Sequence, residues 1–214
     1  MELREALTQI SEIRLQMARS ELFRGYRSLT VGFSGLLGIF AASIQTTWVA
    51  SPQEDLDDYL KLWFIVAMLS LTIVGIELFH KAFTSGSGLV KQMTLSAIGQ
   101  FLPCVFVGAL LTLAIFRGAP EVAWMLPGLW AMLFALGIFS SYRMLPSPVC
   151  WVGGYYVMCG CLCLIVGQGE LAYSPWLMGI TFGLGQLISA FILYWTLERV
   201  DDRERADGSQ KEIG

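Results

Sequence analysis

The sequence predicts an all-α integral membrane protein: a six-transmembrane-helix bundle with both termini cytoplasmic, preceded by an N-terminal amphipathic helix. Apolar residues make up 55% of the chain and charged residues only 14%, whereas soluble domains carry about a quarter charged residues. The mean hydropathy is +0.61. The apolar residues also gather into six runs, each near the roughly 20 residues that a bilayer core requires.

Residues 1–27 are predicted to be a cytoplasmic amphipathic helix. Apolar residues recur there at the three- and four-residue spacing of one helix face; they are Leu3, Leu7, Ile10, Ile13 and Met17. Two interpretations stay open. The helix lies on the inner leaflet of the membrane, or it docks onto a partner protein or a second copy of the chain.

The transmembrane domain is predicted over residues 28–198, with a charged cytoplasmic tail at 199–214. Its spans lie near 29–50, 59–79, 94–116, 122–141, 148–166 and 175–197. An even number of spans puts both termini on one side. Twelve of the 14 Lys and Arg residues lie on that side, and only Lys61 and Arg117 lie on the other. Cytoplasmic loops are enriched in basic residues, so we expect cytoplasmic termini and a plasma-membrane or inner-membrane location.

The cytoplasmic end of the second span carries the residues best suited to ion binding or catalysis. Glu77, His80 and Lys81 share one helix face by their spacing. An ionisable residue within a span is costly and marks a functional candidate. Glu77 and His80, with Gln100 from the third span and Arg143 from the end of the fourth, form the predicted polar or ion site. The other interpretation is structural: Glu77 reaches water or pairs with Lys81, Arg143 or Arg27.

Small residues predict where helices approach closely. Glycine lets helix backbones come together, and the predicted packing positions are Gly32, Gly35, Gly38, Gly179 and Gly183. We expect these positions to form seams within the chain more often than dimer faces. The outer end of the first span is polar, and Gln45 there must find a partner or water.

The pattern of potential metal ligands predicts no metal site and no cofactor. Cys159, Cys161 and Cys163 alternate, so only the first and third share a helix face. Di-iron sites need two Glu-x-x-His motifs, and the chain has one, at Glu77 and His80. The net charge of −3, without a basic block, predicts no nucleic-acid partner.

Two functional hypotheses follow for a chain whose surroundings are the lipid bilayer. The first is a non-enzymatic membrane component (a scaffold, sensor or regulatory subunit) that engages a protein partner or itself through the N-terminal helix. The alternative is a small transporter or channel-like protein with a cytoplasm-facing polar site around Glu77 and Gln100. An intramembrane enzyme is the weakest interpretation, because no second catalytic group can be placed beside Glu77 or His80.

Overall fold

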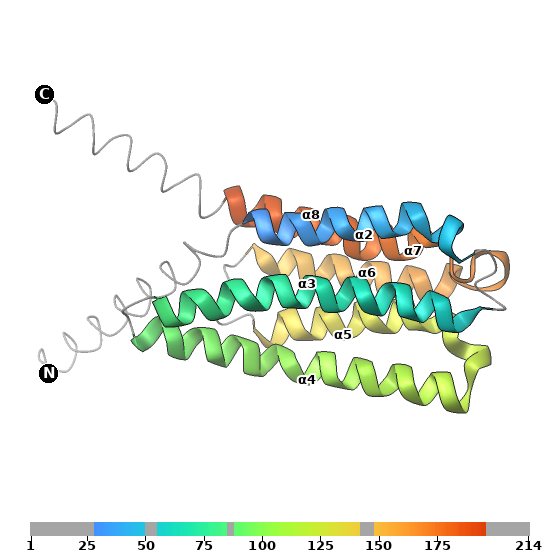
Figure 1. Cartoon of the computed structure of the whole chain (residues 1–214), viewed down its shortest axis with the longest axis horizontal. Coiled ribbons are helices and arrows are strands. Elements are labelled where there is room, and N and C mark those ends of the chain that lie inside the picture. The colour runs from blue at the N-terminus through green and yellow to red at the C-terminus, as the bar shows by residue number, and fades with distance from the viewer. Residues whose placement is uncertain (1–27, 50–54, 85–87, 142–147, 196–214) are drawn as a thin grey trace, which may run out of the picture.

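The chain folds as a bundle of long helices (Figure 1). The computed structural model describes residues 28–49, 55–84, 88–141 and 148–195. The predicted N-terminal helix, the C-terminal tail and Arg143 lie outside these ranges. Within them every regular element is helical, and six stretches are long and apolar enough to cross a membrane. The predicted six-helix membrane fold is confirmed to that extent, and the protein is a multi-pass membrane protein.

The six long stretches follow one another with short connections. The first three are α2 (Ser28–Trp48), α3 (Leu56–Thr84) and α4 (Gly88–Gly118), which continues through Pro103. The fourth begins as the 3-10 turn η1 (Pro120–Met125) and continues as α5 (Leu126–Ser140), and the fifth is α6 (Val149–Val166). After the turn η3 (Gly169–Leu171), the sixth consists of α7 (Pro175–Met178), the π-helical segment η4 (Gly179–Leu184) and α8 (Gly185–Leu193).

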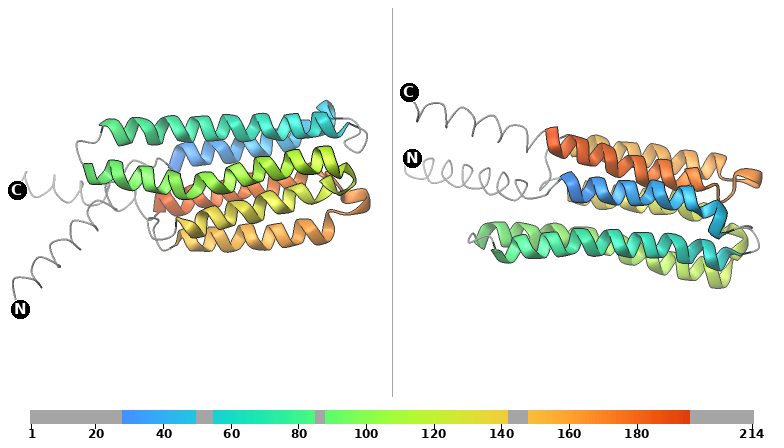
Figure 2. Two further views of the ribbon diagram at one scale, coloured as in Figure 1. Left: turned by 90° about the horizontal axis from the view of Figure 1, so that it is seen from below. Right: turned by 45° about the horizontal axis from the view of Figure 1, so that its top comes forward.

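The hairpin of α3 and α4 lies on one flank of the bundle (Figure 2). α2 packs against α7, η4 and α8, while α5 packs against α4 and α6. Of the six stretches that could cross the membrane, four have 39–44% of their residues buried. The buried share is only 11% in α3 and 6% in α4. The hairpin therefore turns most of its apolar surface away from the rest of the protein.

Two clusters of buried apolar side chains fill the bundle. The first lies toward the α2–α3 connection and contains Ala41, Ala42, Val49, Tyr59, Leu62, Trp63, Ala123, Leu126, Tyr173 and Met178. The second lies toward the opposite end and contains Val31, Ala131, Ala135, Ile138, Val149, Val152, Tyr156 and Leu193. α3 supplies buried residues to the first cluster only. Buried apolar contacts thus anchor the first half of α3 and leave its second half outside the core.

Glycines bring α2 and the sixth helix into backbone contact. A Cβ atom added at Gly35 would lie 2.8 Å from the backbone oxygen of Gly183, and one added at Gly38 would lie 3.2 Å from the Cα of Gly183. Gly32 and Gly179 face small alanine side chains along the same contact. Residues without a Cβ permit this approach. The structure therefore places all five predicted packing glycines in one seam within the chain.

The sixth helix contains a π-helical segment that the apolar pattern does not predict. Polar side chains of α6 face it: the Tyr155 hydroxyl donates a hydrogen bond to the Ile180 carbonyl at 2.7 Å. The Cys163 thiol lies 3.5 Å from the Thr181 hydroxyl. In a membrane interior, backbone groups displaced from regular helical bonding must find other partners. α6 supplies such a partner to the widened segment.

Candidate functional site

Glu77 is tied to a neighbouring helix. It is half-buried on α3, and its carboxylate accepts a hydrogen bond from the hydroxyl of Thr30, in the first turn of α2. A hydroxyl that donates to a carboxylate makes a charge-assisted bond, which is stronger than one between neutral groups. This bond joins the second half of α3 to the start of α2. That half of α3 supplies no residue to the two buried apolar clusters.

Gln100 contributes its backbone to a second helix contact. The Ser140 hydroxyl, at the end of α5, lies 3.1 Å from the backbone oxygen of Gln100 and 2.9 Å from that of Gly137. Pro103 carries no N–H, so the carbonyl of Gly99, four residues earlier, lacks its helical donor. The Ser140 hydroxyl contacts the next carbonyl, that of Gln100, and ties α5 to α4.

The other two predicted site residues are His80 and Arg143. His80 is exposed on α3, and Arg143 lies outside the described residues. The polar contacts tie Glu77 to α2 and Gln100 to α5. These contacts join α3 to α2 and α4 to α5.

The contacts between helices also show how the helices are shifted relative to one another along the bundle axis. Near the α2–α3 connection, Trp130 of α5 donates to the Thr112 hydroxyl of α4 at 2.9 Å. Toward the other end, Thr30 is level with Glu77, and Ser140 with Gln100. At about 1.5 Å per residue, α3 then runs about 10 Å past Glu77, and α4 begins about 18 Å before Gln100. The α3–α4 hairpin therefore projects beyond α5 and α6, as Figure 1 shows.

The projecting end of the hairpin, which we call the hairpin tip (residues 79–84 and 88–95), exposes aromatic and cationic side chains. Phe79 and Phe83 are 62% and 56% exposed, and their ring centroids lie 4.3 Å apart. The Nζ atom of Lys91 lies 4.4 Å from the centroid of the Phe83 ring. A cation over an aromatic face is attracted by the electron-rich ring. Aromatic and cationic side chains thus share one exposed surface at this end of the protein.

Gln45 is a buried polar residue with two side-chain hydrogen bonds, whose partners the sequence did not reveal. It is 1% exposed. Its Nε2 donates to the backbone oxygen of Tyr173 at 2.8 Å, and its Oε1 accepts from Nε1 of Trp63 at 3.0 Å. One side chain thus joins α2, α3 and the connection before α7. The polarity of Gln45 in an apolar run was the available signal.

Tyr173 adopts an unusual backbone conformation beside Gln45. Its φ is +62°, in the left-handed region that bulky residues rarely enter. The side chain is buried, and its ring meets that of Tyr59 edge-on at a centroid distance of 5.1 Å. The hydrogen bond from Gln45 and this ring contact hold the connection into α7 against the end of the bundle.

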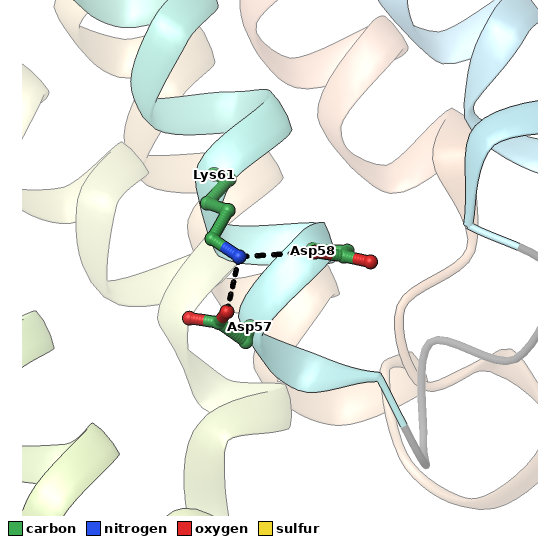
Figure 3. A network of polar contacts seen from close by, with 3 residues as sticks. All are labelled: Asp57, Asp58 and Lys61. Atoms are coloured by element: carbon green, nitrogen blue, oxygen red, sulfur yellow. Dashed lines mark hydrogen bonds and ion pairs between the residues drawn. The ribbon is translucent and has the colours of Figure 1, made fainter.

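The acidic end of α3 carries an ion-pair network. Lys61 contacts the carboxylates of Asp57 and Asp58, the latter at 3.2 Å (Figure 3). The three side chains are exposed, and exposed pairs of this kind contribute little to stability. Beside them, an open cavity of about 400 Å³ is lined by Asp55, Leu56, Asp57, Asp58, Phe116 and Pro120. This cavity and the hairpin tip lie at opposite ends of the hairpin.

The cysteines follow the faces of their helix. Cys159 and Cys163 are buried on α6, and Cys161 between them is exposed, as a helical period requires. Among the described residues, no group of three or more His, Cys, Asp or Glu side chains is arranged to hold a metal ion.

Comparison of the chain with known protein families, with curated proteins and with solved structures found no match.

Proposed function

We propose that this multi-pass membrane protein is a non-enzymatic component (a scaffold, sensor or regulatory subunit) that engages a protein partner or a second copy of itself through its N-terminal amphipathic helix. The observation that carries the proposal is the use of polar side chains as ties between helices. Glu77, Gln45 and Ser140 each bond to a different helix or connection of the same chain. These bonds orient helices, which is the role that such bonds have in membrane bundles.

The proposal includes a membrane orientation. Both termini, the α3–α4 turn and the α5–α6 connection face the cytoplasm, in the plasma or inner membrane. The excess of Lys and Arg on that side supports this orientation. The start of α2 and the end of α8 lie at the same end of the bundle as the end of α3 and the start of α4 (Figure 1). In the proposed orientation, residues 3–17 are available to partners on the cytoplasmic side.

The second candidate function is a small transporter or channel-like protein with a cytoplasm-facing site around Glu77 and Gln100. Pro103 within α4, and the half-buried position of Gln100 one turn before it, favour this function. A proline leaves one backbone carbonyl of a helix without its donor, and transporters use such free backbone carbonyls in binding sites at membrane depth. This function predicts that Glu77→Gln abolishes flux of protons or cations into proteoliposomes, whereas the first function predicts no such flux in the unchanged protein.

The test of the first function is a deletion of residues 2–20, followed by paired substitutions within that segment. Leu7→Glu and Ile10→Glu interrupt the apolar stripe, and Glu12→Gln changes a residue off the stripe as the matched control. Membrane insertion should be unchanged in all variants, because the six apolar helices remain. Resonance energy transfer between labelled copies, and crosslinking to a partner in the native membrane, should disappear in the deletion and the stripe variants only. An unchanged interaction profile after the deletion would refute the proposal.

A further inference from the structure

The hairpin tip lies at the depth of the lipid headgroups. The apolar stretch of α3 that could cross the membrane ends at His80, and that of α4 begins at Thr94. Beyond these residues α3 continues to Thr84 and α4 starts at Gly88, which adds about 6 Å and about 9 Å of helix at the usual rise. The headgroup region adds roughly 5 to 7 Å to each side of the hydrocarbon core. The two helix ends therefore match the thickness of one headgroup layer.

The apolar part of the tip continues the lipid-facing surface of α3. Ile76 is 65% exposed, and Phe79 and Phe83 follow it along the helix at three- and four-residue spacing. Toward the start of α3, Leu69 and Phe64 are also exposed, so exposed apolar side chains recur from the first half of the helix to the tip, with Thr72 and His80 as exposed polar residues among them. A soluble partner would meet only the end of such a surface, whereas lipid covers its whole length. This continuity favours lipid as the occupant.

The charge of the tip is positive. Lys81 and Lys91 lie in it, and no Asp or Glu occurs between Glu77 and Glu121. Glu77, the nearest carboxylate on the hairpin, is engaged by Thr30. Lys91 is exposed, with its ammonium over the Phe83 ring. Lysine side chains near helix ends extend their charge into the headgroup layer while the apolar stem stays in lipid. A positive charge at that depth is complementary to anionic phospholipid.

We propose that the tip of the α3–α4 hairpin is a binding site for an anionic phospholipid. Lys91 contacts the headgroup phosphate, and the rings of Phe79 and Phe83 lie against the glycerol and upper acyl region of the same lipid. Aromatic side chains are enriched at this depth in membrane proteins. The site is built from residues of α3 and α4, so its test is separate from that of the proposed protein partner.

The test is native mass spectrometry of the full-length protein in detergent, titrated with phosphatidylglycerol and, separately, with phosphatidylcholine of the same acyl chains. The unchanged protein should bind the first phosphatidylglycerol more tightly than the first phosphatidylcholine. Each basic side chain near an anionic surface contributes about fivefold in affinity. Lys91→Gln should therefore weaken phosphatidylglycerol binding about fivefold and leave phosphatidylcholine binding unchanged, and Lys91→Arg should retain the preference.

The matched control is Lys61→Gln, which removes a lysine at the opposite end of α3 where Asp57 and Asp58 already neutralise it. Its lipid preference should equal that of the unchanged protein. A salt titration of the unchanged protein provides a test that needs no variant, because screening should reduce the preference for phosphatidylglycerol.

Three results would overturn the proposal. The first is equal affinity of the unchanged protein for both lipids, or a preference that does not respond to salt. The second is a preference that survives in Lys91→Gln. The third is displacement of phosphatidylglycerol by inorganic phosphate at matched concentration, which would indicate a site for free phosphate. Crosslinking of the tip to a protein in place of lipid, in the native membrane, would also count against it.

Discussion

Replacement of Gln45 by leucine tests how much a buried hydrogen-bonded side chain contributes to the bundle. Gln45 is 1% exposed and bonds to both Trp63 and the Tyr173 carbonyl. Leucine is of similar size, so Gln45→Leu removes both hydrogen bonds with little change in packing. The indole N–H of Trp63 and the carbonyl of Tyr173 then lose their partner in an interior that water does not reach. The unfolding free energy should fall.

The size of the effect follows from the two bonds. Hydrogen bonds between membrane helices average about 0.6 kcal/mol and reach about 1.7 kcal/mol. Gln45→Leu should therefore cost about 1.2 to 3.4 kcal/mol for the two bonds together. Trp63→Phe removes only one of the two bonds, so the coupling energy in a double-mutant cycle with Gln45→Leu should be about 0.6 to 1.7 kcal/mol.

The assay is reversible unfolding of the purified protein in mixed micelles by increasing mole fractions of sodium dodecyl sulfate, followed by circular dichroism. Thr47→Val is the matched control, because Thr47 is exposed on the same helix and donates only to the Ile44 carbonyl. Its unfolding free energy should change by a few tenths of a kcal/mol, about the size of surface substitutions. A coupling energy of zero, or a Gln45→Leu protein as stable as Thr47→Val, would refute the reasoning.

Three further predictions use the same unfolding assay. Gly35→Ala should destabilise the protein by about 1 to 3 kcal/mol, because its Cβ would lie 2.8 Å from the Gly183 oxygen. Gly99→Ala is the control: no atom lies within 4 Å of its added Cβ, so it should be neutral or stabilising by up to about 1 kcal/mol. Equal effects of the two substitutions would contradict the glycine seam. Glu77→Leu should destabilise the protein by about 1 kcal/mol. Glu77→Gln should destabilise it less, because the glutamine carbonyl still accepts from Thr30. A larger loss in Glu77→Gln than in Glu77→Leu would show that the charge matters more than this bond. Thr30→Val should also destabilise, and the double variant Thr30→Val, Glu77→Leu should lose less than the sum of the two single variants, since both remove the same bond.

The six helices could be predicted from sequence because the bilayer imposes a single strong rule. Every backbone group within the hydrocarbon must bond inside its own segment, so runs of about 20 apolar residues become helices. The predicted spans carry the same six apolar runs that the structure forms into long helices. The full length of the hairpin helices was harder to predict. The apolar stretch of α4 begins at Thr94, but the helix itself begins at Gly88 and includes polar and basic residues before Thr94.

The partners of polar residues could not be predicted, because they depend on which helices are neighbours and at what height. Spacing alone offered Lys81 as a partner for Glu77. The structure supplies Thr30, 47 residues away, which meets Glu77 because α2 and α3 are antiparallel neighbours. Gln45 is a similar case: its polarity required a partner, but Tyr173 lies 128 residues away. Helix packing brings such pairs together, and no periodic pattern in the sequence reveals them.

The π-helical segment of the sixth helix was hidden for a related reason. Glycine and apolar residues over Gly179–Leu184 fit a regular helix equally well. The contacts that accompany the wider turn come from another helix, through Tyr155. The glycines themselves were predicted as packing positions because a small side chain has the same meaning in any membrane helix, namely that a backbone approaches closely.

Membrane topology is the most direct test of the central claim that the chain crosses the bilayer six times with both termini in the cytoplasm. The measurement inserts paired reporters into the full chain, a fluorescent protein that matures in the cytoplasm and a phosphatase that is active only outside it. Six crossings predict fluorescence at both termini and after residues 86 and 146, and phosphatase activity after residues 53, 119 and 168. Termini on opposite sides, or two neighbouring connections on the same side, would contradict the six-helix topology.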